Sequence, residues 1–184
     1  MHKTRSLVLI VALVLYSLRA SATVLVPADL GELAHDAGAI VRGRIAAAET
    51  RWTGDRRAIE TVVTVDVEES LKGSLGRTVQ FVVPGGTLGR YRSILVGAPQ
   101  FIVAERVVVF LGWRGPSYPY LLGLGQGVFR IAADANRSGA RVTPPPMIAP
   151  AAGAVRLVRG DVSRVPVPLA EFEQRVRTLA GGPR

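Results

Sequence analysis

The chain contains no cysteine. This absence excludes a disulfide framework, thiolate ligands for a metal and a thiol nucleophile. A lipid anchor of the bacterial lipoprotein kind is not expected either, because it is attached to a cysteine that follows the signal segment. The fold must therefore rest on a hydrophobic core, for which residues 23–184 are enough.

Histidine is scarce, since only His2 and His35 are present. A catalytic zinc ion usually needs three protein ligands, so His35 is interpreted as a surface residue at the end of a first helix. No serine lies in a Gly-x-Ser-x-Gly frame. We therefore predict no catalytic residue, metal or cofactor and expect a protein that is not an enzyme. An enzyme of unrecognised type is the alternative.

Lysine is also nearly absent: Lys72 is the only one after residue 22. The net charge of +9 falls to +6 when residues 1–22 are removed. The remaining positive charge is almost all arginine, scattered along the chain, and is interpreted as the codon bias of a GC-rich genome. Without a basic block, nucleic-acid binding is not predicted.

The first 22 residues resemble a secretory signal peptide. A basic start precedes an apolar run over residues 6–18 and a small-x-small motif ending at Ala22, which predicts cleavage before Thr23. The run is shorter than the roughly 20 residues that a membrane-spanning helix needs. We expect a periplasmic or secreted protein with no stable membrane insertion. The alternative is an uncleaved anchor, since Arg19 lies close to the cut.

Two long alternating segments, residues 40–47 and 59–68, flank a turn signal at 53–56 and predict a hairpin of strands that each exceed ten residues. Strands of that length must bend, as in small barrels. The inner face is expected to hold Val41, Gly43, Ile45, Ala47, Ile59, Thr61, Val63, Val65 and Val67. The carboxylates of residues 60–69 are interpreted as a solvated strand face rather than as paired catalytic acids.

A turn centred near residues 54–55 predicts the pairing within this hairpin. Arg44 would oppose Asp66 and Arg42 would oppose Glu68 on the outer face, and Ile45 would oppose Val65 on the inner face.

Further strands are predicted over residues 78–83, 107–111, 118–122 and 128–132. The continuous apolar run 107–111 is typical of a strand covered on both faces. A short helix is predicted over residues 27–34, with Asp29 and Glu32 near its positive end. Glycine-rich segments at 84–86 and 123–127 are interpreted as turns or bulges rather than phosphate loops, and residues 87–100 show no clear periodicity.

The C-terminal part contains three consecutive prolines and then an amphipathic helix, predicted over residues 168–179. Its apolar face (Leu169, Phe172, Val176, Leu179) is expected to pack on the β domain, and its charged side (Glu171, Glu173, Arg175, Arg177) to stay in water. The alternative is a free tail whose apolar face binds a partner. The expected organisation is a signal peptide (1–22), a β domain (23–140), a proline-rich linker (141–167) and a C-terminal helix and tail (168–184).

Four aromatic residues near predicted strand ends or loops are candidate contacts for a sugar or a protein partner: Trp52, Trp113, Tyr118 and Tyr120. The alternative is that they cap the core.

The segment 33–45, with its helix, acidic-small step and Val-x-Gly-x-Val-like strand, resembles exported bacterial domains with a netrin-like fold, similar to the N-terminal domain of tissue inhibitors of metalloproteinases. The Val-x-Val-x-x-x-Leu-Lys-Gly pattern of residues 65–73 and the apolar strand that follows Phe101 and Glu105 match the same family, with Ala104 where glycine is usual. The resemblance covers residues 30–111 and implies an OB-type barrel of five strands. It implies no site residue, because the animal inhibitors chelate zinc through an N-terminal cysteine that this chain lacks.

The sequence therefore predicts a mainly β protein, an OB-like barrel of five to six strands with a short N-terminal and a C-terminal helix. Its predicted function is to bind another protein in the cell envelope or outside the cell, with a protease as one version of that partner. The alternative is a binder of carbohydrate or of an anionic envelope polymer. The oligomeric state is left open.

Overall fold

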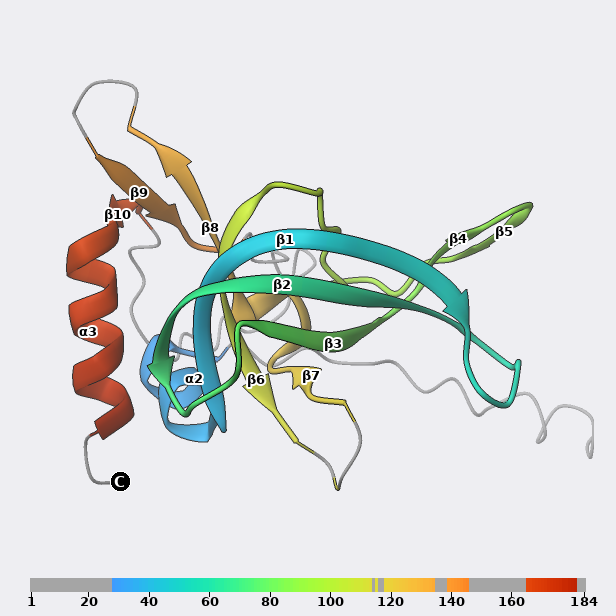
Figure 1. Cartoon of the computed structure of the whole chain (residues 1–184), viewed down its shortest axis with the longest axis horizontal. Coiled ribbons are helices and arrows are strands. Elements are labelled where there is room, and N and C mark those ends of the chain that lie inside the picture. The colour runs from blue at the N-terminus through green and yellow to red at the C-terminus, as the bar shows by residue number, and fades with distance from the viewer. Residues whose placement is uncertain (1–27, 114, 116–117, 135–138, 146–164, 182–184) are drawn as a thin grey trace, which may run out of the picture.

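A computed structural model describes residues 28–113, 115, 118–134, 139–145 and 165–181. The predicted signal peptide, its cleavage site before Thr23 and the start of the first helix at Pro27 lie outside the described residues. Within them the chain is mainly β, as predicted. Helix α2 precedes the strands in the chain and helix α3 follows them, and the two helices lie on the same side of the sheet (Figure 1).

The elements follow in the order α2 (Leu30–Asp36), β1 (Ala39–Trp52), β2 (Ile59–Lys72), β3 (Thr78–Pro84), β4 (Gly86–Leu88), β5 (Tyr91–Ser93), β6 (Arg106–Gly112), β7 (Tyr120–Leu121), the 3-10 helix η1 (Leu124–Gly127), β8 (Val128–Ala133), β9 (Ala140–Thr143), β10 (Val167–Pro168) and α3 (Leu169–Gly181). The large sheet has the strand order β1-β2-β3-β7-β6-β8-β9-β10, and β4 and β5 form a separate hairpin.

Strand β1 pairs with β6 as well as with β2. The pairings of β1, β2, β3, β7 and β6 therefore return to β1 and form a closed circuit. All of these pairings are antiparallel except that of β3 with β7, which is parallel. Strands β8, β9 and β10 extend the sheet beyond β6.

The register of the long hairpin agrees with the predicted pairing in its central part. Arg44 pairs with Asp66, and Ile45 pairs with Val65. The predicted pairing of Arg42 is wrong by one residue: a register shift after Arg42 places it opposite Glu69.

Another register shift, between Ile45 and Ala47, changes the face on which Ala47 lies. Ala47 stands opposite Thr64 and not on the inner face beside Ile45. The expectation that it continues the inner face is therefore wrong, because the irregularity adds one residue to β1 and inverts the alternation beyond it. Such irregularities also bend a strand, and Figure 1 shows β1 and β2 curving together.

Gly43 lies where β2 leaves no room for a side chain on β1. A Cβ atom added to Gly43 would lie 2.3 Å from the carbonyl oxygen of Asp66 and 2.6 Å from a methyl group of Val65. Only glycine fits here, because both contacts belong to the interior of the paired strands.

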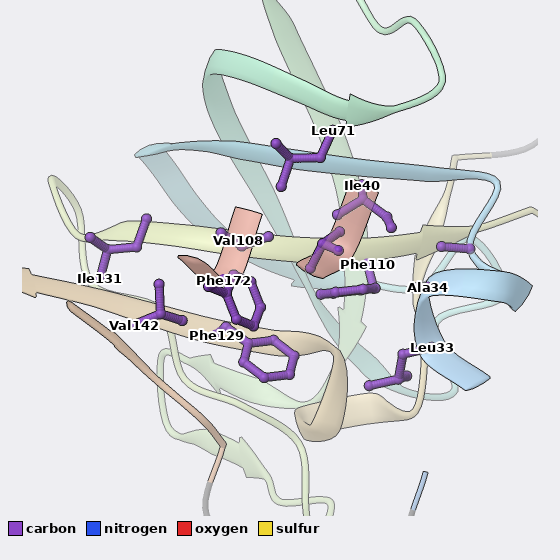
Figure 2. Packing of buried hydrophobic residues seen from close by; sticks show 12 residues of the cluster. Leu33, Ala34, Ile40, Leu71, Val108, Phe110, Phe129, Ile131, Val142 and Phe172 are labelled. Atoms are coloured by element: carbon purple, nitrogen blue, oxygen red, sulfur yellow. The ribbon is translucent and has the colours of Figure 1, made fainter. Parts of the chain in front are cut away.

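Strand β6 is buried on both faces, as predicted from its apolar run, because a core lies on each side of it. The first core lies between the sheet and the helices and contains the ring pairs Phe110–Phe129 and Phe129–Phe172 (Figure 2). The second core lies inside the circuit of strands and is formed by Val41, Ile45, Val63, Val65, Val79, Phe81, Val83, Val107, Val109, Leu111, Leu121 and Val128. Alternate residues of β6 contribute to the two cores.

Helix α2 begins one turn later than predicted, at Leu30, because Asp29 is its N-cap. The Asp29 carboxylate accepts a hydrogen bond from the Glu32 N–H at 2.7 Å, and the Glu32 carboxylate accepts one from the Asp29 N–H at 3.2 Å. This reciprocal pair is a capping box. His35 lies in the last turn of the helix, as expected.

Helix α3 packs on the first core, so the predicted docking is confirmed. Phe172 and Val176 are buried, and Leu169 and Leu179 are partly buried against the same core. The expectation that Glu173 stays in water is wrong: it is only 8% exposed. Its burial has a specific ionic cause, described below.

Several short elements differ from the predicted ones. The strand expected over residues 118–122 is limited to Tyr120–Leu121, and residues 87–100 contain most of the β4–β5 hairpin. The glycine-rich segment 123–127 forms the 3-10 helix η1. The predicted linker 141–167 is not a linker at its two ends, where residues of β9 and β10 pair with each other. Its middle, residues 146–164, lies outside the described residues. Strands this short carry too few residues for a detectable period.

Candidate functional site

The connection between β5 and β6 exposes the densest group of aliphatic side chains in the described part of the chain. We call residues 94–103 the aliphatic connection. Its exposed side chains are Ile94 (69%), Leu95 (41%), Val96 (76%), Ile102 (68%) and Val103 (59%). Single exposed apolar residues are ordinary, but several within ten residues make this connection a candidate interaction surface.

The aliphatic connection is held in place from its middle. Phe101 and Ala98 pack against the core inside the strand circuit, and the Phe101 ring meets the Phe81 ring edge-on with centroids 5.5 Å apart. Phe101 and Ala98 are thus the two apolar residues of the connection that point inward. The remaining aliphatic side chains therefore point outward on a supported backbone.

Backbone hydrogen bonds hold the far end of the connection against β1. The Ile45 N–H donates to the Glu105 carbonyl at 2.8 Å, and the Ala104 N–H donates to the Ile45 carbonyl at 2.8 Å. Arg130 of β8 adds a hydrogen bond to the Gln100 carbonyl at 2.7 Å and an ion pair with Glu105. A surface already held in one shape loses little conformational entropy when it binds.

Gly125 allows η1 to support the near end. Its N–H donates to the Gly97 carbonyl at 3.0 Å, and an added Cβ would lie 2.5 Å from that oxygen. The glycine-rich segment that the sequence offered as a turn thus permits a close backbone contact beneath the aliphatic connection.

The four aromatic candidates do not share one surface. Trp52, at the end of β1, is half-buried and meets the Tyr91 ring edge-on, with centroids 5.4 Å apart. Trp113 is 40% exposed and packs against Gly38, just before the start of β1. The two tryptophans therefore lie at opposite ends of a strand of 14 residues.

Tyr118 and Tyr120 line an open pocket together with residues 82–84 of β3. Tyr118 is 52% exposed, and the guanidinium carbon of Arg51 lies 6.0 Å from the centroid of its ring. That distance is at the limit of a cation–π contact. Two of the predicted aromatic residues thus share a pocket, and the other two stand apart from each other.

The ionisable side chains gather in a network between β1, β2, β6 and α3. Arg42 lies 3.3 Å from Glu68 and 3.1 Å from Glu69, and it forms an ion pair with Glu173. Arg106 donates two hydrogen bonds to Glu68, at 3.1 and 2.7 Å. These bonds hold the pKa of Glu68 below its ordinary value, because they stabilise the carboxylate. The paired charges join strands to a helix, which is a structural role.

A second perturbed carboxyl group lies in the β1–β2 turn. The pKa of Asp55 in the β1–β2 turn is lowered by hydrogen bonds from the Thr53 hydroxyl and the Arg57 N–H, which order the turn. Among the described residues, no three histidine, cysteine, aspartate or glutamate side chains are grouped so that they could hold a metal ion. The same residues include no helix with the length and apolarity to cross a membrane.

The aliphatic connection was not among the residues singled out from the sequence. Its apolar residues follow neither the helical nor the strand period, and Gly97 and Pro99 interrupt them. The sequence does contain one signal for this surface: apolar residues in a segment that has neither the helical nor the strand period by which such residues are usually placed on a buried face. No protein-family model, curated protein or solved structure matches the chain.

Proposed function

We propose that this protein is an exported, non-enzymatic domain that binds another protein in the cell envelope or outside the cell, and that the aliphatic connection contacts that partner. The proposal is carried by the exposure of five aliphatic side chains on a backbone fixed by Phe101, Gly97 and Glu105. A protease is one version of the partner.

The fold that we propose for this function is an OB-type barrel. Its support is the closed circuit of five strands, with one parallel pairing between β3 and β7, together with the netrin-like motifs of residues 30–111. The barrel provides a rigid frame on which the β5–β6 connection is displayed.

The chemistry of the aliphatic connection favours a protein over a carbohydrate. Sugar hydroxyls need hydrogen-bonding groups and aromatic faces, whereas side chains such as Val96 and Ile102 offer neither. A protein partner has apolar side chains that gain from burial against them, at about 25 cal/mol per Å². The pocket at Tyr118 and Tyr120 is the surface that a carbohydrate ligand would use.

Site-specific crosslinking tests the proposal. Because the chain has no cysteine, Val96→Cys and Ile102→Cys each provide a single attachment point for a photoreactive probe. Gln174→Cys, exposed on α3, is the matched control. In cells of the native host, we expect the same protein adduct from positions 96 and 102 and none from 174. Introducing Leu95→Asp into the Val96→Cys or the Ile102→Cys protein should abolish the adduct.

Equal adducts from all three positions, or none from the aliphatic connection, would contradict the assignment. Binding of envelope polysaccharide that is lost in Tyr118→Ala but kept in Leu95→Asp would instead support the carbohydrate function.

Export has its own test. The mature protein recovered from the periplasm or medium should have the intact mass of residues 23–184. Recovery of the protein in a membrane fraction with Met1 attached would overturn the predicted cleavage and favour an anchor.

A further inference from the structure

The second half of β1 has one open edge. Strand β1 pairs with β6 only from Ala39 to Arg44, and Ile45 is bonded to Glu105. From Ala47 to Trp52 it pairs with β2 alone, and no other described strand is hydrogen-bonded to its other edge. The β4–β5 hairpin contacts this half of β1 through side chains, since Tyr91 meets Trp52. Figure 1 shows β1 and β2 continuing together past β6.

The hydrogen bonds of the hairpin identify the backbone groups on this open edge. The Thr53 N–H donates to the Ala58 carbonyl, and the Ile59 carbonyl accepts from Gly85 beyond β3. Backbone groups alternate in direction along an antiparallel strand, so those of residues 49 and 51 point toward β2. The N–H and C=O groups of Ala48, Thr50 and Trp52 therefore point away from β2, along the open edge.

We propose that this edge pairs antiparallel with the same edge of a second copy of the chain, with Thr50 on the two-fold axis. Thr50 then opposes Thr50 of the second copy, and Ala48 opposes Trp52 in both directions. In each of these pairs, the backbone N–H and C=O groups of both residues point toward the other copy. Ala48, Thr50 and Trp52 of each copy therefore become hydrogen-bonded to the other copy. The inference does not rest on the aliphatic connection or on the proposed partner.

Charge selects this register. Between the hydrogen-bonded pairs, Glu49 of each copy stands opposite Arg51 of the other. Both side chains are exposed, and they share the outer face of β1. Arg51 lies 2.9 Å from Glu60 within its own hairpin, and among the described residues no ion pair is present for Glu49. Opposite charges at directly opposed positions stabilise a strand pair.

The neighbouring registers are disfavoured. A shift of two residues in one direction places Glu49 opposite Glu49, and a shift in the other direction places Arg51 opposite Arg51. A shift of one residue places backbone groups that point toward the open edge opposite backbone groups of the other copy that point toward its own β2, so the hydrogen bonds between the copies are lost. The edge is therefore self-complementary in one register, as a two-fold interface requires.

Charge reversal on the full mature chain tests the pairing. Sedimentation velocity from about 1 μM to about 1 mM should show a monomer–dimer equilibrium for the unaltered chain. Glu49→Arg and Arg51→Glu each oppose like charges and should raise the dissociation constant by about tenfold or more. The double variant E49R/R51E restores opposite charges and should recover dimerisation. Thermal melts of the four proteins establish that each is folded.

Disulfide trapping tests the register. Glu49→Cys and Arg51→Cys are made as separate proteins, each with one cysteine. Non-hydrogen-bonded antiparallel partners have Cα atoms about 4.5 Å apart, within the range for a disulfide. On oxidation, a mixture of the two proteins should form the mixed disulfide faster than either protein forms a disulfide with itself.

Three results would overturn the proposal. The first is a chain that stays monomeric at every concentration. The second is a dimer that neither single charge reversal weakens, which would use another surface. The third is a dimer in which self-disulfides form as readily as the mixed one.

Discussion

Arg42 on β1 forms an ion pair with Glu173 on α3, 131 residues later in the chain. The Arg42 side chain is 18% exposed and that of Glu173 is 10% exposed. This contact explains why a charged residue of α3 is buried: the helix lies over Arg42, which already has two carboxylates of β2 beside it. The ion pair fixes α3 to the outer face of the long hairpin.

Removing this carboxylate should weaken the attachment of α3. Glu173→Ala leaves Arg42 beneath the helix without one of its partners, so we expect a loss of about 1–3 kcal/mol in the free energy of unfolding. Glu171→Ala, on the exposed side of the same helix, should change it by less than about 0.5 kcal/mol. Urea denaturation of both variants measures the difference. Equal losses would show that the ion pair contributes nothing beyond helix propensity.

Acid should destabilise the protein through Glu68. Its pKa is lowered in the folded state from 4.5, mainly by the hydrogen bonds from Arg106. A depressed folded-state pKa gives stability that is present above the unfolded-state value and is lost as the pH falls through the folded-state value. Urea midpoints between about pH 7 and pH 3 should therefore fall less steeply for Glu68→Gln than for the unaltered chain. Glu171→Gln should follow the unaltered chain, and a slope unchanged in Glu68→Gln would refute this linkage.

The close approach of β1 and β2 should make Gly43 intolerant of a side chain. Gly43→Ala places a methyl group against the Asp66 carbonyl and is expected to cost about 1–3 kcal/mol through overpacking and strand displacement. Gly54→Ala is the control, because a Cβ in that turn meets nothing within 4 Å. The comparison is made by thermal or urea unfolding. A Gly43→Ala protein as stable as Gly54→Ala would mean that the strands separate at no cost.

The packing of α3 should be most sensitive at Phe172. This ring lies 4.9 Å from the Phe129 ring, between centroids, and is buried in the core shown in Figure 2. Phe172→Ala is expected to cost about 3–5 kcal/mol. Leu169→Ala, at the partly buried start of the helix, should cost less. Near-equal melting temperatures for Phe172→Ala and the unaltered chain would favour the alternative of a free C-terminal helix.

The sequence by itself determined the features that depend on local pattern. The two-residue period of the long hairpin, with a turn signal between its strands, determined that Arg44 opposes Asp66 and Ile45 opposes Val65. The unbroken apolar run of β6 determined a strand with a core on each side. The spacing of Phe172 and Val176 determined the face by which α3 packs. In each case burial of one face requires a period that is visible in the residue order.

The tertiary structure alone decided the features that depend on distant partners. The displacement of Ala47 comes from one added residue in β1, which a period of alternating residues does not reveal. The burial of Glu173 depends on Arg42, and the return of β6 to β1 closes a circuit between strands that are distant in sequence. Val96 is exposed whereas Phe101 of the same connection is partly buried, and this difference was set by the core that packs beneath Phe101. Residue order specifies which side chains prefer to be buried, but only the folded arrangement supplies the surfaces that bury them.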